Sequence, residues 1–261
     1  MQLKRVQLIY FSATEKTKCI GQAVAKGTGL PVQEWDATAQ RASNPFESDV
    51  QTLTILAAPV FVGRIPQPFL QRLQQKKGNG PAILVVTYGA RASEDALLEL
   101  KKEASKLGYL PIAAGEFVAQ HSMACTIAEH RPTEQDLKEA EEFGRKAALL
   151  AQAMPKDRLP VLEVPGQDPY RSHNKVAFAP TANKNCVECG RCADRCPVGA
   201  IPAEHPNKTD KQKCISCMRC VFVCPMQARS IGFVEKQLIY HKIRKLCDEN
   251  QPNRMWFAEL Q

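Results

Sequence analysis

The sequence has 261 residues, a formal net charge of +8 and 11 cysteines, and this length is sufficient for two domains. It begins without the charged, apolar and small-residue segments of a signal peptide, and no apolar run reaches the length of a transmembrane helix. We therefore expect a cytoplasmic protein with reduced thiols and no membrane partner.

Apolar runs alternate with helical patterns through residues 1–153. The runs predict strands at residues 3–10, 32–36, 53–58, 82–86 and 112–119. Helices are predicted to end near residue 26, to cover 68–77, to lie between Ser93 and Gly108, and to begin at Thr133. Strands that alternate with helices predict an α/β fold with a parallel sheet covered on both faces.

Two of these helices have candidate capping residues at their starts. Ser93 is expected to cap the third helix, with Glu94 and Asp95 in its positive first turn. Thr133 and Asp136 have the spacing of a capping box at the start of the fourth helix.

The sequence changes character after residue 153. Recurrent prolines predict an extended linker at 154–179, which leads to a second domain at 180–234. A short strand is expected at 231–234. A helical tail at 235–261 with many basic residues follows, and we expect it to pack on its own protein rather than on a membrane or nucleic acid.

Eight of the 11 cysteines lie in two copies of one motif, C-x2-C-x2-C-x3-C-P. The second copy follows the first by 28 residues at every cysteine, and Arg191 corresponds to Arg219 in the same register. The sequence therefore contains an internal duplication of a metal site.

The spacing assigns these cysteines to two [4Fe–4S] clusters. Three closely spaced thiolates converge on one cubane, whereas the fourth, followed by proline, leads away to the other cluster. One set is Cys186, Cys189, Cys192 and Cys224, and the other is Cys214, Cys217, Cys220 and Cys196.

Two alternatives are weaker. Structural zinc sites normally use two separated cysteine pairs, and a disulfide framework requires an oxidising compartment. The doubled motif with both prolines resembles the bacterial two-[4Fe–4S] ferredoxins, which implies a small α+β domain with two clusters.

A second candidate site lies in the first domain. Five parallel strands suit the doubly wound order 2-1-3-4-5, in which ligands bind beyond the carboxyl ends of strands one and three. The loop at residues 12–17 is rich in hydroxyl groups and opens a helix, so it can hold a phosphate.

The sequence Ser-Ala-Thr-Glu-Lys-Thr at 12–17 resembles the FMN-phosphate loop of flavodoxins, S/T-x-T-G-x-T. The resemblance covers residues 1–153 and implies a flavodoxin-like fold that binds FMN through three loops. The implied contacts are Ser12, Ala13, Thr14, Glu15, Lys16 and Thr17 in the first loop, Pro59, Val60, Phe61, Val62 and Gly63 in the second, and Thr87, Tyr88, Gly89 and Arg91 in the third.

Individual residues of this site carry further expectations. Glu15 stands where the flavodoxin pattern has glycine, and a carboxylate near a phosphate is unfavourable unless it points to solvent. We expect Phe61 and Tyr88 to stack on the flavin. His121, just after the fifth strand, is expected to be a packing or capping residue.

Together the two halves resemble the flavodoxin–ferredoxin fusion proteins of anaerobic bacteria. This implies electron transfer between FMN, which exchanges two electrons, and clusters that exchange one. The alternatives are a flavin-dependent reductase of a small molecule fed through the clusters, and a ferredoxin whose first domain has lost FMN and only docks partners.

The cofactors also change the interpretation of the charge. Each oxidised cubane with its thiolates carries about −2, and a flavin phosphate removes up to about two more charges, so the net +8 falls to about +2. We therefore expect redox partner proteins, some of them acidic, and no nucleic acid. The long linker permits transfer within one chain or within a homodimer.

Overall fold

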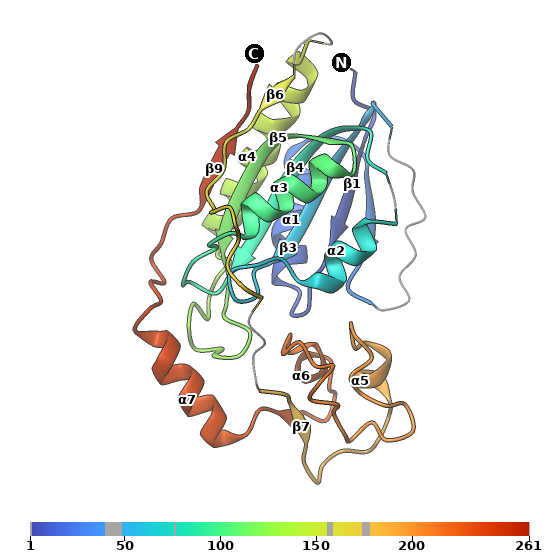
Figure 1. Ribbon diagram of the computed structural model, residues 1–261, viewed down its shortest axis with the longest axis vertical. Coiled ribbons are helices and arrows are strands. Elements are labelled where there is room, and N and C mark those ends of the chain that lie inside the picture. Colours follow the sequence, from blue (N-terminus) through green and yellow to red (C-terminus); the bar gives the residue numbers. More distant parts are fainter. Residues whose placement is uncertain (1, 40–48, 76, 156–158, 174–177, 261) are drawn as a thin grey trace.

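The computed structural model describes residues 2–39, 49–75, 77–155, 159–173 and 178–260. Its centre is a six-stranded sheet with the order β2-β1-β3-β4-β5-β9 (Figure 1). The strands are β1 (Arg5–Tyr10), β2 (Val32–Asp36), β3 (Thr52–Pro59), β4 (Gly80–Tyr88), β5 (Tyr109–Val118) and β9 (Arg254–Phe257). The first five are parallel in the predicted order 2-1-3-4-5, so the predicted fold class is confirmed.

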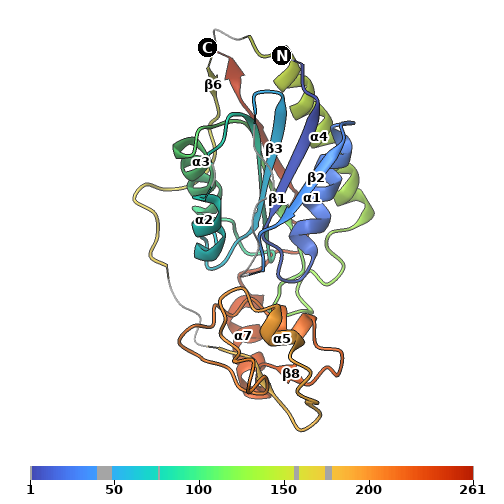
Figure 2. The ribbon, with the colours of Figure 1, turned by 90° about the vertical axis from the view of Figure 1, so that its right-hand side faces the viewer.

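Helices cover both faces of this sheet (Figure 2). One face carries α1 (Lys16–Gly27) and α4 (Glu134–Ala153), and the other carries α2 (Gln67–Leu73) and α3 (Ala96–Lys106). All residues of β4 are buried, as expected for a parallel strand with both faces covered. Gly144 lets α4 approach α1 closely, because a Cβ there would overlap the carbonyl oxygen of Val24.

The two predicted caps have different outcomes. Thr133 and Asp136 form the capping box of α4, and the Asp136 amide donates to Thr133 Oγ1 over 3.2 Å. Ser93 does not cap α3, which begins at Ala96. Its hydroxyl instead donates to the buried carboxylate of Glu116 on β5, which requires a hydrogen-bond donor.

The eight cysteines of the two motifs lie in a compact region below the carboxyl ends of the sheet (Figure 1). We call residues 181–230 the cysteine region. It is closed by β7 (Thr181–Ala182), which pairs with β8 (Arg229–Ser230), and contains the single-turn helices α5 (Arg191–Asp194) and α6 (Arg219–Phe222). The strand predicted at 231–234 is wrong: Phe233 begins α7 (Phe233–Arg244), and its side chain is exposed.

The C-terminal segment is helical only in α7, unlike the helical tail expected at 235–261. After α7 the chain returns to the sheet, where β9 pairs antiparallel with β5. The last strand, β10 (Glu259–Leu260), pairs with β6 (Pro160–Val161) from the predicted linker. In the part of the chain that the structure describes, no helix has the length and apolar character needed to cross a membrane.

Candidate cofactor sites

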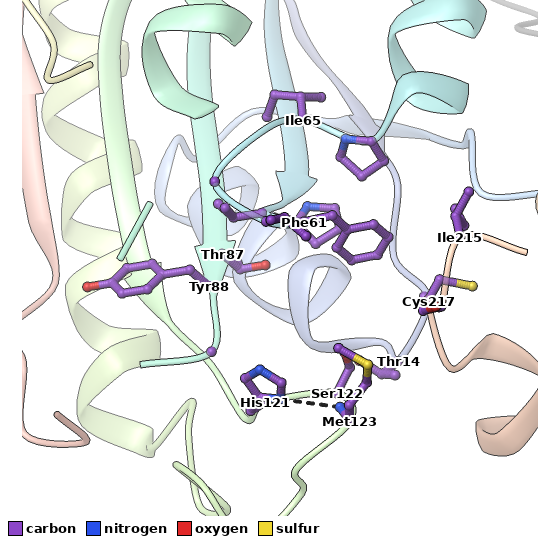
Figure 3. A pocket seen from close by; sticks show the side chains of 18 of the residues that line it. Thr14, Phe61, Ile65, Thr87, Tyr88, His121, Ser122, Met123, Ile215 and Cys217 are labelled. Carbon is purple, nitrogen blue, oxygen red and sulfur yellow. Dashed lines mark hydrogen bonds between the residues drawn. The ribbon is translucent and has the colours of Figure 1, made fainter. Parts of the chain in front are cut away.

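A cavity of about 850 Å³ lies between the sheet and the cysteine region (Figure 3). Its volume is within the usual range for cofactor pockets. Most of the residues that the flavodoxin resemblance implies line it, namely Ala13, Thr14, Lys16, Thr17, Pro59, Val60, Phe61, Val62, Gly63, Thr87, Tyr88, Gly89 and Arg91. Ser12 and Glu15 do not line it. The three loops therefore meet at one site, as the strand order predicts.

The start of α1 provides a candidate anion-binding site at this cavity. The Glu15 side chain does not cap the helix, and the first turn of the helix contains no acidic residue. The amide of Lys18 donates to Ser12 Oγ over 3.1 Å, whereas the first-turn amides of Lys16 and Thr17 have no acceptor within the helix. A bound anion would stabilise Lys16 at this positive helix end, whereas Lys18 Nζ already lies 3.7 Å from the Glu15 carboxylate. These groups fit a phosphate.

The hydroxyl groups of the first loop divide into two roles. Ser12 is buried behind the cavity, where its amide donates to Thr38 Oγ1 over 2.7 Å and fixes the loop. Thr14 and Thr17 line the cavity. Thr17 Oγ1 lies 2.7 Å from Thr87 Oγ1, so it joins the start of α1 to the end of β4. Only two of the three predicted hydroxyls therefore face the cavity.

Glu15 has a left-handed backbone with φ 63°. For a residue other than glycine this conformation costs about 1–2 kcal/mol, which explains the glycine of the flavodoxin pattern. Its side chain is turned away from the cavity. The carboxylate accepts a hydrogen bond of 2.5 Å from Arg219 of the cysteine region, and Lys18 Nζ lies 3.7 Å from it.

The two aromatic residues expected to stack on a flavin differ in the structure. Phe61 lines the cavity and makes an edge contact with Phe11, at 6.3 Å between ring centroids. The ring of Tyr88 points away from Phe61 (Figure 3), and its hydroxyl donates to Gln251 Oε1 over 3.1 Å. Burial raises the pKa of Tyr88 to about 12. Tyr88 thus packs in the core and does not offer the stacking that we expected.

His121 lines the cavity and is a packing and capping residue, as expected from the sequence. Its Nδ1 accepts hydrogen bonds from the amides of Met123 and Ala124, at 3.3 and 3.1 Å, so Nε2 carries the hydrogen. Burial, with a smaller contribution from Arg91, lowers the pKa of His121 to about 4. The ring packs against Gly89, where a Cβ would overlap it. At neutral pH the cavity wall therefore presents an uncharged N–H donor.

The structure brings the first predicted cysteine set together. Cys186, Cys189, Cys192 and Cys224 line one small pocket, with Pro225 beside them. The fourth cysteine of the second copy thus lies among the first three of the first copy. This placement is the crossover that the spacing indicated, and the assignment of these thiols as ligands remains a prediction.

The second set gathers on the side that faces the sheet. Burial raises the pKa of the Cys217 thiol, and the neighbouring thiols Cys220, Cys196 and Cys214 raise it further. Burial likewise raises the pKa of Cys220 to about 11. Thiols of this kind become ligands only when a metal displaces their protons.

Backbone amides repeat the duplication around the sulfur atoms. The Ala200 amide donates to Cys196 Sγ over 3.2 Å, and the corresponding Ala228 amide donates to Cys224 Sγ over 3.3 Å. Such N–H···S bonds stabilise thiolates and set cluster potentials. Among the described residues, no three His, Cys, Asp or Glu side chains are spaced for a single metal ion, and four thiolates around a cubane are further apart than four around one ion.

Two arginines dock the cysteine region on the sheet. Arg72 of α2 donates to the carbonyl of Pro197, directly after Cys196, over 2.5 Å. In the opposite direction, Arg219 donates to the carbonyls of Ser12 and Ala13 over 3.4 and 3.2 Å. Both side chains are buried. The docked position places Cys214 and Cys217 on the wall of the large cavity (Figure 3).

Comparisons with known proteins agree with the division into two halves. Residues 185–229 match the protein family described as 4Fe-4S dicluster domain. No curated protein matches the sequence. The match covers the cysteine region and supports iron–sulfur ligation there.

Solved structures resemble the sheet half of the chain. A flavodoxin from the domain Archaea has 13% identity and a TM-score of 0.41, over 57% of this chain and 99% of its own. A flavodoxin, WrbA-like protein from Agrobacterium tumefaciens has 15% identity and a TM-score of 0.39, over 57% and 98%. A flavodoxin mutant from Fusobacterium nucleatum bound to flavin mononucleotide has 12% identity and a TM-score of 0.38, over 57% and 96%.

The strand order, rather than these distant similarities, identifies the flavodoxin-like fold. The chain joins this fold to an iron–sulfur domain, as the predicted fusion requires. This combination indicates electron transfer.

Proposed function

We propose that the protein transfers single electrons between two [4Fe–4S] clusters and an FMN bound in the large cavity. The observation that carries this proposal is the composition of the cavity wall. Cys214 and Cys217, assigned to the second cluster, line the same cavity as the Thr14 loop and Phe61. One chain therefore brings both candidate cofactor sites together, which favours transfer within a chain over transfer within a homodimer.

The residues present suit FMN. The first-turn amides of α1, Thr14 and Lys16 would hold the phosphate, and Phe61 and the loop at 87–91 would flank the ring. Among the described residues that line the cavity, none is Asp or Glu, so no carboxylate faces the phosphate there. Bound FMN would supply a centre that takes two electrons together and releases them singly.

The first cysteine set suits exchange with a partner protein. Cys189 is exposed, and so are the neighbouring apolar side chains of Val187 and Met226. Arg191 adds positive charge to this surface, which favours an acidic redox partner, whereas Arg195 is paired with Asp194 over 3.3 Å. A reducing cytoplasm suits the many cysteines, which the structure does not join in disulfides among the described residues.

The proposed domains follow from this arrangement. Residues 1–153 form the FMN-binding unit, and residues 180–234 form the cluster unit, with 154–179 between them. The C-terminal residues 235–261 serve both units, because α7 lines the cavity and β9 completes the sheet.

The reductase alternative requires a proton donor beside the flavin. His121 has the position for this role. However, a neutral imidazole whose pKa is lowered to about 4 is a weak proton donor at neutral pH. We therefore prefer electron transfer.

Cofactor analysis tests the proposal. Protein purified without oxygen should contain about eight irons and eight sulfides per chain, and one FMN. Cys196→Ser should remove the second cluster, although Cys196 lies in the first motif. Cys224→Ser should remove the first cluster, although Cys224 lies in the second motif. Stoichiometric zinc with little sulfide would contradict the clusters, and clusters without flavin would favour the docking-only alternative.

A further inference from the structure

The internal duplication places an arginine at the same position of both cysteine motifs, but the two side chains have different surroundings. Arg191, in the first copy, is exposed, and no hydrogen bond or ion pair is found for its side chain within the described residues. Arg219, in the second copy, is only 7% exposed. Its side chain reaches into the sheet domain and contacts the loop that follows β1. The duplication thus allows Arg219 to be compared with Arg191, which has the same position in the motif but, among the described residues, no hydrogen bond or ion pair with the sheet domain.

Arg219 holds this loop from behind. Its Nη1 donates to the carbonyls of Ser12 and Ala13 and to Glu15 Oε1, so one guanidinium group engages three of the loop's first four residues. Arg219 does not line the cavity, whereas Ala13 and Thr14 do. The arginine therefore shapes the loop without occupying the space for the ligand.

The contact also determines where the Glu15 carboxylate lies. Glu15 directly precedes α1, at the positive helix end where an anion would bind. A carboxylate free to turn toward that site would repel a phosphate and compete for the same amides. The ion pair with Arg219 holds it on the opposite side of the loop, away from the cavity.

We propose that Arg219 is a positioning residue for the flavin phosphate: by pairing with Glu15 it makes FMN affinity depend on the docked second-cluster motif. The inference rests on the proposed FMN site. Linkage requires the reverse effect as well, so bound FMN should stabilise the docked cysteine region. The glycine of the flavodoxin pattern has thus been replaced by a residue that ties the phosphate loop to the neighbouring cluster.

The test is a double-mutant cycle on FMN affinity. FMN dissociation constants are measured by equilibrium dialysis for cluster-loaded, flavin-stripped wild type, Arg219→Met, Glu15→Gly and the double variant. Arg191→Met is the matched control, because it removes the corresponding arginine of the first motif. Iron and sulfide are quantified in each protein to show that the clusters are retained.

We expect Arg219→Met to raise the dissociation constant about tenfold, which corresponds to about 1.4 kcal/mol. Glu15→Gly should lower it, and adding Glu15→Gly to Arg219→Met should remove most of the loss, because no carboxylate is left to release. Arg191→Met should have no effect. A general structural defect at Arg219 would not be rescued by a change at Glu15.

The outcomes separate this inference from the proposed function. Equal dissociation constants in wild type and Arg219→Met, or a loss that Glu15→Gly does not rescue, would overturn the role of Arg219 while leaving the FMN site intact. The role of Arg219 would also be overturned if FMN affinity fell only in protein that had lost iron. Failure of wild type and all variants to bind FMN would overturn the proposed function and this inference with it.

Discussion

His121 is held neutral by its surroundings. Its Nδ1 accepts two amides and its ring lies against Gly89, so protonation would place an uncompensated charge beside Arg91. The pKa of His121 is lowered to about 4 in the folded protein, against about 6.5 in an unfolded chain. Between these values the unfolded state binds more protons, so the free energy of unfolding should fall as the pH falls from about 6.5 to 4.

We expect His121→Asn to reduce this pH dependence. The asparagine oxygen can accept the same amides but does not titrate in this range. In wild type, His121 should contribute up to about 1.4 kcal/mol per pH unit. Urea unfolding at pH 5, 6 and 7, followed by tryptophan fluorescence, measures the difference. His130→Asn, at an exposed histidine, is the control, and equal slopes in wild type and His121→Asn would contradict the prediction.

Substitutions of Thr14 test the candidate anion-binding site directly. It lines the cavity beside the start of α1 and is partly exposed, so a substitution there does not disturb the core. Thr14→Asp should abolish FMN binding through repulsion of the phosphate, whereas Thr14→Asn, of nearly the same shape, should weaken it far less. The dissociation constants of the two variants should therefore differ strongly at low salt and converge as salt is added. If both variants lose FMN equally, charge at this position is not the cause.

For individual residues, the sequence supports some predictions better than others. The spacing of the cysteines places the eight candidate ligands, because each motif is local. The departure at Glu15 is also visible in the sequence. Its partner Arg219 is not, because the two residues are 204 positions apart. For Tyr88, an aromatic residue in a site loop suggests stacking, but only the packing decides where the ring points.

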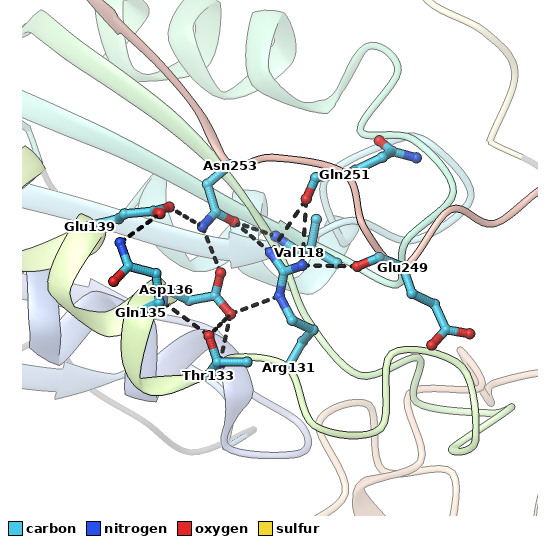
Figure 4. Close-up of polar contacts among 9 residues, drawn as sticks. All are labelled: Val118, Arg131, Thr133, Gln135, Asp136, Glu139, Glu249, Gln251 and Asn253. Carbon is cyan, nitrogen blue, oxygen red and sulfur yellow. Dashed lines mark hydrogen bonds and ion pairs between the residues drawn. The ribbon is translucent and has the colours of Figure 1, made fainter.

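Among the elements, the C-terminal strand β9 anchors the end of the chain to the sheet. It extends the sheet at β5, and Asn253 just before it bonds to both β5 and α4 (Figure 4). Asn253 Oδ1 accepts from the Val118 amide over 3.0 Å, and its Nδ2 donates to Asp136 and Glu139 over 2.8 and 2.7 Å. The segment before it also holds the loop after β4, since Gln251 donates to the Ala90 carbonyl over 3.2 Å.

We expect Asn253→Ala to lower the free energy of unfolding by about 1–3 kcal/mol, because it leaves the partly buried Val118 amide without its acceptor and removes one hydrogen bond from the buried Asp136 carboxylate. Burial alone would raise the pKa of Asp136, but hydrogen bonds from Thr133 and Asn253 and the charge of Arg131 lower it. In the variant the pKa of Asp136 should move back toward its ordinary value, so acid should reduce the free energy of unfolding less than it does in wild type. Urea unfolding checks both effects, and exposed Asn250→Ala should remain within about 0.5 kcal/mol of wild type.

The order of β1 to β5 follows from the sequence because alternating buried strands and amphipathic helices leave few topologies. The sequence does not predict strand β9 in the same way. It has only four residues, with an exposure pattern that is partly buried at its centre, and its partner β5 lies more than 100 residues away. The error at 231–234 has a local cause, since apolar Phe233 and Val234 are exposed on the first turn of α7.

In the molecule as a whole, the cysteine region lies against the carboxyl ends of the sheet (Figures 1 and 2). Cys214 and Cys217 of the second set line the cavity, and Cys189 of the first set is exposed. The sequence left open whether the long linker serves one chain or two. The contacts of Arg72 and Arg219 favour one chain. Transfer inside one chain should then have a rate that does not depend on protein concentration.

The most direct test of the electron-transfer proposal is rapid mixing of the fully loaded protein with a one-electron reductant, followed at flavin and cluster wavelengths. Wild type should show cluster reduction followed by flavin reduction at a rate independent of protein concentration. Cys217→Ala should lose this fast flavin phase, whereas Cys125→Ala, at an exposed cysteine outside both motifs, should retain it. Flavin reduction at the same rate in wild type and Cys217→Ala, or a rate that rises in proportion to protein concentration, would contradict the account.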